Sequence, residues 1–216
     1  SCVEGMAHVR GMGMTGGWEI EESAESDLPG EAGNEGTWSI DTNLWSRSIE
    51  GGDLEEPDHV PGEELYEWTT APSGSGEEIE LGFENGYPVS LDGEELDPIE
   101  LIEALNELAG SYGVGRTDMM EDRMLGLKVR ENYEHPAATV LLNAHEGLEA
   151  LVLTKEERDF KQQVDGEWSQ KGYAGLVDGP LVAALQGFIE ETHTQVTGKA
   201  THTFECGQTH VVVIVN

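Results

Sequence analysis

A segment of mixed charge near the middle of the chain offers the clearest opportunity for chemistry. Residues 113–141 read GVGRTDMMEDRMLGLKVRENYEHPAATVL, in a chain that has only 11 basic residues against 44 acidic ones. The basic residues of the segment are Arg116, Arg123, Lys128 and Arg130, and the acids beside them include Glu121, Asp122 and Glu131. These charges could bind a zwitterionic small molecule, or they could pair with one another across two strands. Composition alone leaves both interpretations open.

A second candidate is a run of small polar groups earlier in the chain. It lies between Trp38 and Gly52 and has no clean helical or strand periodicity. Its hydrogen-bonding residues are Ser39, Asp41, Asn43, Ser46, Arg47 and Ser48. The run could form the wall of a polar pocket, or it could be an ordered surface loop held by Trp38 and Trp45.

Other motifs carry less weight. The GMGMTG run at residues 11–16 matches a dinucleotide fingerprint, but the residues before it are too short and polar for the required strand. His202, Cys206 and His210 are evenly spaced, yet they lack a fourth ligand at zinc spacing. We interpret His145 as an interior histidine with satisfied hydrogen bonds. The sequence therefore predicts no catalytic residue, no cofactor-binding residue and no metal ligand.

Composition excludes several classes of function. The formal net charge of −33 disfavours binding to nucleic acid and to anionic membranes, because both need basic residues. A DNA mimic would be acidic too, but these carboxylates are mixed with ordinary core patterns. We interpret the charge as an adaptation to high salt, where the Debye length falls to ~3 Å at 1 M. No apolar run approaches a membrane span, and residues 1–17 lack a signal-peptide core, so we expect a cytoplasmic protein.

Helical signals recur along the second half of the chain. Asp97-Pro98 forms an N-cap with Pro at the first helical position, and Thr154 with Glu157 forms a capping box. We predict helices over 97–110 or 97–113, 136–148, 154–172 and 180–195, and a short one over 18–27.

Strand signals group into hairpins. Asn85-Gly86 is a turn signal between two strands, and Cys206-Gly207 separates the last two. We predict strands over 65–70, 78–84, 87–91, 114–121, 124–133, 199–205 and 209–215. Strands and helices are segregated rather than alternating, which favours an α+β fold: an antiparallel or mixed sheet with hairpins, packed against about four helices.

Long motifs in this chain resemble the C-terminal domain of argininosuccinate synthase. The segments that carry the resemblance are WSIDTNLWSRSIEGGDLEEP (38–57), LGFENGYPVSLDGEEL (81–96), GVGRTDMMEDRMLGLKVRENYEHPAATVLLNAH (113–145) and FKQQVDGEWSQKGYAGLVDGPLVAAL (160–185). It extends from about residue 18 to residue 198. On this basis residues 37–216 are expected to form that C-terminal domain, and residues 1–36 the end of a nucleotide-binding domain and a linker.

The resemblance implies a substrate and a partial binding site. The family is an ATP-dependent carbon–nitrogen ligase of arginine biosynthesis, which joins citrulline to aspartate through a citrullyl-adenylate. Matching motif positions gives four citrulline-binding residues: Ser39 and Ser48, Glu121, and Tyr133. Glutamate can accept hydrogen bonds from the citrulline ammonium, and hydroxyls can bind its neutral and polar groups. Under this interpretation Arg116, Arg123, Lys128 and Arg130 brace the strand pair that presents Glu121 and Tyr133, or they balance charge at the pocket.

The resemblance also implies what the 216 residues do not contain. The Ser-Gly-Gly-x-Asp-type pyrophosphate loop of the family is not found, and ATP is a co-substrate of the family rather than a tightly bound cofactor. We therefore expect aspartate and ATP to bind only with the missing domain, and the chain alone to be inactive. Family members are usually homotetramers, so we expect a homo-oligomer or association with a full-length synthase.

Two alternatives to a synthase fragment remain open. One is a non-catalytic paralogue that binds citrulline or assembles with a full-length synthase. The other is the product of a pseudogene. A pyrophosphate-loop sequence in the DNA upstream of Ser1 would favour a broken synthase, whereas a full-length copy elsewhere in the genome would favour a paralogue.

Overall fold

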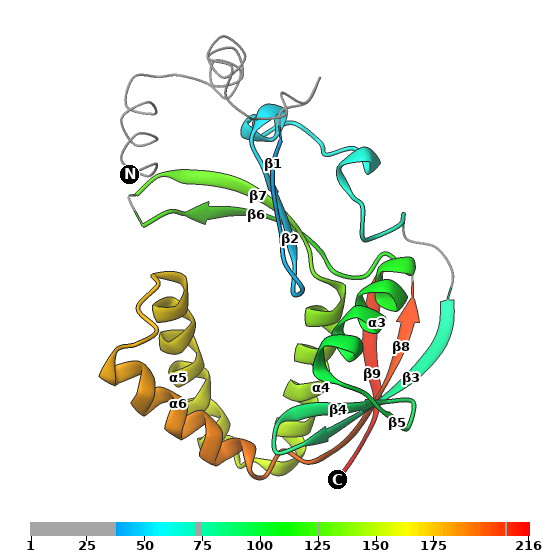
Figure 1. Ribbon diagram of the computed structural model, residues 1–216, viewed down its shortest axis with the longest axis vertical. Helices are drawn as coiled ribbons and strands as arrows, with labels where there is room; N and C mark the ends of the chain where they lie inside the picture. The colour runs from blue at the N-terminus through cyan, green and yellow to red at the C-terminus, as the bar shows by residue number, and fades with distance from the viewer. Residues whose placement is uncertain (1–37, 72–74, 125, 206) are drawn as a thin grey trace. The chain divides into compact units, whose positions relative to one another are not determined.

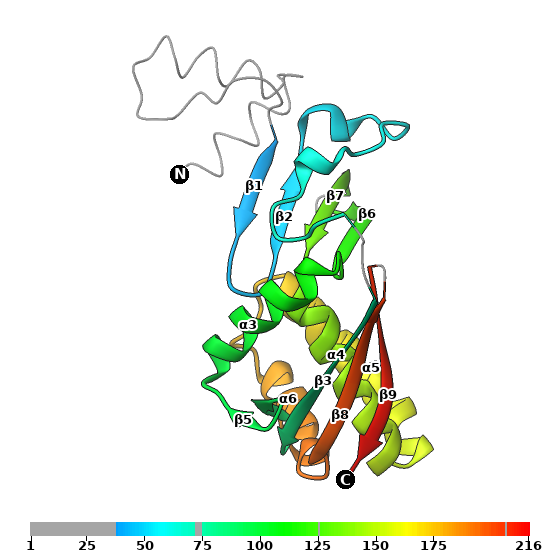
Figure 2. The same cartoon turned by 90° about the vertical axis from the view of Figure 1, so that its right-hand side faces the viewer.

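The part of the chain that the structure describes combines four α-helices with two antiparallel sheets, which confirms the predicted α+β class (Figures 1 and 2). The computed structural model describes residues 38–71, 75–124, 126–205 and 207–216. These residues divide into two units. The described part of the first unit comprises 38–41, 48–62 and 118–132, and that of the second comprises 42–47, 63–71, 75–117 and 133–216 apart from Leu125 and Cys206. The dinucleotide-like run at 11–16 and the helix predicted over 18–27 lie outside the described residues.

A four-stranded sheet contains the mixed-charge segment. Its order is β1 (Ser39–Thr42), β2 (Arg47–Glu50), β7 (Lys128–Glu134) and β6 (Arg116–Asp122). The sequence predicted β6 and β7 but not the first hairpin. The Asn43 N–H donates to the Ser46 carbonyl at 3.0 Å, and the Asn43 side chain accepts from two turn amides. The hydroxyl-rich run therefore forms two paired strands rather than a loop.

A five-stranded antiparallel sheet lies in the second unit. Its order is β5 (Glu94–Glu95), β4 (Tyr87–Leu91), β3 (Ser75–Glu84), β8 (Gly198–Glu205) and β9 (Gln208–Val215). Both predicted hairpins are confirmed. At the first turn Asn85 and Gly86 have φ of 50° and 81°, which fits the Asn-Gly signal. At the edge, β9 leaves Val212, Val213 and Val215 half exposed.

The four described helices agree with the predicted ones. They are α3 (Pro98–Ser111), α4 (Pro136–Val152), α5 (Lys155–Tyr173) and α6 (Pro180–His193). The capping boxes of Asp97 with Glu100 and of Thr154 with Glu157 are both formed. Helices α5 and α6 form an antiparallel pair in which the Phe160 and Phe188 rings meet edge to face at 5.2 Å. None of the helices described is both long and apolar enough to cross a membrane.

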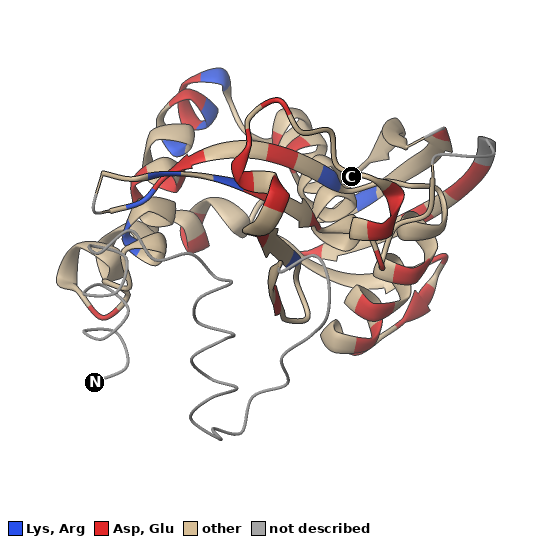
Figure 3. Ribbon diagram, turned by 90° about the horizontal axis from the view of Figure 1, so that it is seen from above, with Lys and Arg blue, Asp and Glu red and all other residues tan. Residues whose placement is uncertain are grey.

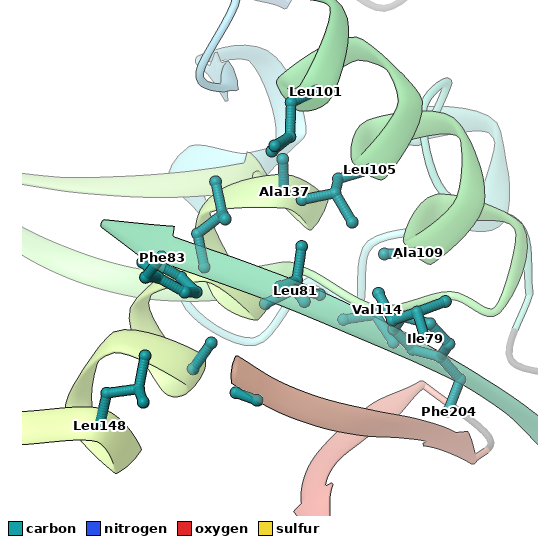
Figure 4. Packing of buried hydrophobic residues seen from close by; sticks show 14 of the residues in the cluster. Ile79, Leu81, Phe83, Leu101, Leu105, Ala109, Val114, Ala137, Leu148 and Phe204 are labelled. Carbon is teal, nitrogen blue, oxygen red and sulfur yellow. The ribbon is translucent and has the colours of Figure 1, made fainter. Parts of the chain in front are cut away.

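The main core lies between β3, β8, α3 and α4. Ile79, Leu81 and Phe83 alternate along β3, so they point to one face of the sheet (Figure 4). Leu101, Leu105 and Ala109 of α3, Ala137 and Leu148 of α4, and Phe204 of β8 cover that face. Each of these side chains is at most 3% exposed. The apolar face of the sheet and the apolar stripes of α3 and α4 therefore form the core of this unit.

The strand predicted over residues 65–70 is wrong. The segment 63–65 forms a short 3-10 helix, η2 (Glu63–Leu65), and the following residues are irregular. Their backbone amides donate to the carboxylate of Glu134 instead of to another strand. The segment also passes close to α3, because a Cβ on Gly110 would lie 2.2 Å from the Trp68 carbonyl oxygen. A side-chain acceptor and a close helix contact thus replace strand pairing.

Candidate functional site

The arginines of the mixed-charge segment are held in ion pairs. Arg123 contacts Glu50 at 2.7 Å and also contacts Glu131. Arg130 binds both carboxylate oxygens of Asp118, at 2.9 and 2.7 Å, and this guanidinium lowers the pKa of Asp118. Figure 3 shows how few basic residues there are among the acidic ones. The grouping of basic residues in the mixed-charge segment is therefore unusual for this chain.

The second unit holds Arg116 in a similar way. Its guanidinium binds both oxygens of Glu63 at 2.9 Å, donates to the Thr69 hydroxyl at 2.7 Å and lies 3.8 Å from the centre of the Tyr66 ring. Hydrogen bonding to Arg116 lowers the pKa of Glu63. These contacts, with those of Arg123 and Arg130, confirm that the arginines brace local structure.

Strand alternation places two of the four predicted residues on one face within the first unit. Side chains two apart on a strand point to the same side, and Arg123 Nη1 lies 4.0 Å from Glu121 Oε2. The pairs that share a side are Ser48 with Glu50 and Glu121 with Arg123. Because Arg123 contacts Glu50, these two pairs lie on the same face. Tyr133 belongs to the second unit.

Each predicted citrulline residue lies on a different strand of this sheet. Ser39 is exposed at the start of β1, and Ser48 is half-buried on β2. Glu121 lies on β6 with its side chain 14% exposed, and Tyr133 is half-buried on β7. Glu121 thus combines partial burial with access from solvent, as a carboxylate that binds a ligand ammonium requires.

A buried carboxylate that sequence reasoning missed is Glu134, at the end of β7. It is 0% exposed and accepts from Arg47 at 2.8 Å, from the Thr69 hydroxyl at 2.7 Å and from the Thr69 amide at 2.8 Å. The amides of Glu67 and Trp68 complete this Glu134 network at 3.0 and 2.9 Å. Both carboxylate oxygens are satisfied, so the network is structural. Its donors come from distant segments, and no local sequence pattern indicates them.

A second polar group, the partly buried histidine cluster, consists of His145, Glu149 and His193. Each offers one ligand atom, and these atoms all lie within 4.8 Å of one another. The interpretation of His145 as a satisfied histidine is wrong, because its buried Nε2 has no hydrogen-bond partner among the residues that the structure describes. Burial, with the neighbouring Lys161, lowers the pKa of His145 to about 4. The i, i+4 spacing on α4 could have indicated the first pair, but His193 is distant in sequence.

The strand histidines near the end of the chain do not face one another. His202 is buried on β8, and its Nδ1 lies 3.0 Å from the Thr209 hydroxyl. His210 is exposed on β9 opposite Thr203, the neighbour of His202. Opposite residues of an antiparallel pair share a face, so the two histidines point to different faces. Burial lowers the pKa of His202 to about 4.

A cavity of about 1120 Å³ lies in the second unit, beside the histidine cluster. Its walls come from α4, α5, α6, the β3–β4 hairpin and Trp45. All three members of the cluster line it, together with Lys161 and Asp165 of α5. The cavity could therefore admit a small ligand or water to the cluster.

Comparison with known proteins gives a consistent assignment. Residues 38–214 match the family described as the arginosuccinate synthase C-terminal domain. The chain is 68% identical to the argininosuccinate synthase of Natronomonas pharaonis over 212 residues, which is 98% of this chain and 53% of that protein. It is 63% identical to that of Haloquadratum walsbyi over 209 residues, 96% of this chain and 53% of that protein. The chain thus spans about half the length of the curated relatives it matches.

Proposed function

We propose that this chain, which belongs to the argininosuccinate synthase family, binds citrulline on the face of the four-stranded sheet that presents Glu121. The observation that carries the proposal is the common orientation of Ser48 and Glu121 in the first unit, together with the pairing of the adjacent Arg123 with Glu50 and Glu131. Tyr133, on strand β7, belongs to the proposed set through the family resemblance. Ser39, on the neighbouring strand β1, completes the proposed residue set.

The proposed chemistry assigns charge recognition to Glu121. Citrulline has an ammonium, a carboxylate and a neutral ureido group. A partly buried carboxylate binds an ammonium through charge-assisted hydrogen bonds of about 1.5–3 kcal/mol. The hydroxyls of Ser39, Ser48 and Tyr133 can donate to or accept from the remaining groups without adding charge. Binding would then hold the ureido oxygen in a fixed orientation, which is catalysis by positioning.

The ligation reaction itself is proposed for an assembly that includes the other half of a synthase. ATP and aspartate would bind to that half, and citrulline held by Glu121 would be adenylated there. The 216-residue chain should therefore produce no AMP from ATP, citrulline and aspartate. Release of AMP by the purified chain would contradict this division of labour.

Calorimetric titration of the chain with citrulline, in high salt, tests the binding proposal. Glu121→Gln should weaken binding about 10- to 100-fold, as expected for loss of a charge-assisted hydrogen bond. Asp122→Asn is the matched control, since Asp122 is exposed on the same strand and pairs with Lys128. Its affinity should be unchanged. Equal effects of the two substitutions would contradict the assignment of Glu121.

A ligand analogue separates direct contact from indirect effects. 5-Ureidopentanoate is citrulline without the ammonium group. If Glu121 binds the ammonium, Glu121→Gln should leave the affinity for this analogue nearly unchanged. A loss as large as that for citrulline would show that the substitution acts through the sheet instead.

A further inference from the structure

The histidine cluster joins two helices of the second unit. His145 and Glu149 are four residues apart on α4, so they lie on the same side of that helix. His193 comes from the last turn of α6, and its ring centre lies 4.8 Å from that of His145. Two imidazoles and a carboxylate thus converge from two helices, with their ligand atoms within 4.8 Å of one another.

Packing fixes both imidazole rings. Phe83 meets His145 edge to face at 6.0 Å, and Tyr87 meets His193 in the same way at 6.4 Å. Gly86 lies so close to His193 that an added Cβ would be 2.6 Å from the ring. The turn of the β3–β4 hairpin therefore leaves little room for His193 to move, and ligands held in place in this way lose less entropy on binding.

The hydrogen bonding of His145 is incomplete. Its Nδ1 lies 3.4 Å from Glu149 Oε1, and within the described part of the chain its buried Nε2 has no hydrogen-bond partner. A buried nitrogen without a partner costs free energy, and such a group calls for an explanation such as an ion. A neutral imidazole presents a lone pair to a metal.

We propose that His145, Glu149 and His193 form a binding site for a divalent transition-metal ion of the zinc type. Imidazole nitrogens with one carboxylate suit Zn²⁺, Co²⁺ or Fe²⁺, whereas Mg²⁺ and Ca²⁺ prefer oxygen ligands. Three protein ligands leave a coordination position for water, and the cavity that all three residues line can supply it. This site is separate from the proposed citrulline residues, so either proposal can fail alone.

Lys161 is the main competitor for the ion. Its Nζ lies 2.9 Å from Glu149 Oε1 and 2.7 Å from Asp165 Oδ2. One ammonium between two carboxylates leaves a local charge of −1, which attracts a cation. When Glu149 binds the ion, Asp165 can retain Lys161. The lysine thus holds Glu149 in the absence of metal and opposes metal binding by like-charge repulsion.

Metal titration of the full chain tests the site. Cys2→Ser, His8→Ala and Cys206→Ser form the background, which removes both thiols and one histidine outside the site, and excess Mg²⁺ occupies exposed carboxylates. Co²⁺ should bind one ion per chain and give a visible ligand-field spectrum. His193→Gln should weaken Co²⁺ and Zn²⁺ binding by more than ~10-fold, whereas His210→Gln, at an exposed histidine, should not.

Lys161→Met distinguishes a metal site from a cluster that has only a structural role. It removes the competing ammonium and should tighten Zn²⁺ binding at least several-fold. Circular dichroism checks that each variant is folded. If Lys161→Met does not fold, His145→Gln replaces it, with the same loss expected as for His193→Gln. Two results would overturn the proposal. One is one-to-one metal binding whose affinity is unchanged by His193→Gln, and the other is no metal binding in the presence of excess Mg²⁺.

Discussion

The two ends of α4 hold buried polar groups in opposite ways. Just before the helix, Glu134 receives five hydrogen bonds from Arg47, Thr69 and two further backbone amides. The next residue, His135, has Thr117 at 2.7 Å from one ring nitrogen and Thr139 at 2.9 Å from the other. Every side-chain polar atom of these two residues therefore has a partner.

The second half of α4 leaves polar atoms unsatisfied. His145 Nε2 has no partner among the described residues, and Glu149 relies on the ammonium of Lys161. A cavity adjoins this end of the helix. The comparison suggests that complete pairing fixes a structure, whereas incomplete pairing beside a cavity leaves capacity for a ligand. Four changes test this difference.

The largest effect is expected at the fully paired end. Glu134→Ala should lower the free energy of unfolding by about 3–5 kcal/mol, because it leaves buried Arg47 with only the exposed carboxylate of Glu67 at 3.5 Å and leaves three amides without an acceptor. Denaturant unfolding measures the change. Glu67→Ala, at a side chain that is 75% exposed, is the control and should cost less than about 0.5 kcal/mol. Similar costs at the two positions would contradict a structural role for the network.

The next largest effect is the loss of stability at low pH that is due to His145. His145 has a pKa of about 4 when folded and about 6.5 when unfolded, so the unfolded chain takes up the proton first as pH falls. The stability due to this group is fully present above pH 6.5 and is lost toward pH 4, by up to about 3 kcal/mol. Glu149, Lys161, Asp165 and His193 are the charged or titratable groups around it.

Unfolding curves of His145→Gln between pH 7 and pH 4.5 measure this contribution. The variant should lose less stability on acidification than the wild type. His202, whose pKa burial also lowers to about 4, contributes in both proteins and cancels in the difference. Parallel pH dependences would show that His145 is not held neutral by the fold.

A smaller effect is expected when one partner is removed from the paired histidine. Thr139→Val leaves His135 Nδ1 without its hydroxyl and should cost about 1–2 kcal/mol. Thermal or denaturant unfolding gives the value. A cost near zero would mean that pairing at this end is no more important than at His145, and the contrast between the two ends would disappear.

The smallest effect is expected at the rim of the cavity. Lys155 and Asp159 form an i, i+4 ion pair on α5 with side chains 81% and 61% exposed. Lys155→Ala should change the free energy of unfolding by less than about 0.5 kcal/mol, and less still at high salt. A change above 1 kcal/mol would show that exposed charges near the cavity matter as much as buried ones.

Local signals in the sequence predicted most of the secondary structure. Asp97-Pro98 and the Thr154–Glu157 capping box mark α3 and α5, and Asn85-Gly86 marks the β3–β4 turn. These signals work because their hydrogen bonds join residues close in sequence. The strand predicted over 65–70 failed because its amides bind Glu134, more than sixty residues away.

The candidate sites were likewise predictable where their signals are local in sequence, and were missed where they depend on distant residues. Charge composition alone identified the segment with Glu121 and Tyr133, but only the resemblance to a family selected those residues over the arginines. The hairpin with Ser39 and Ser48 was missed as structure, since its short strands do not alternate clearly in polarity. The pairing of His145 with His193 depends on how α6 packs near α4, which no local pattern encodes.

The exposed valines of β9 have a consequence for how this chain behaves in solution. Val212, Val213 and Val215 are about half exposed on a strand at the edge of its sheet, and edge strands readily pair with other chains. At low ionic strength the net charge of −33 keeps molecules apart. Concentrated salt screens that repulsion and, for salts such as sulfate, strengthens apolar association. Conditions that favour the folded state of an acidic chain therefore also remove its colloidal protection at this edge.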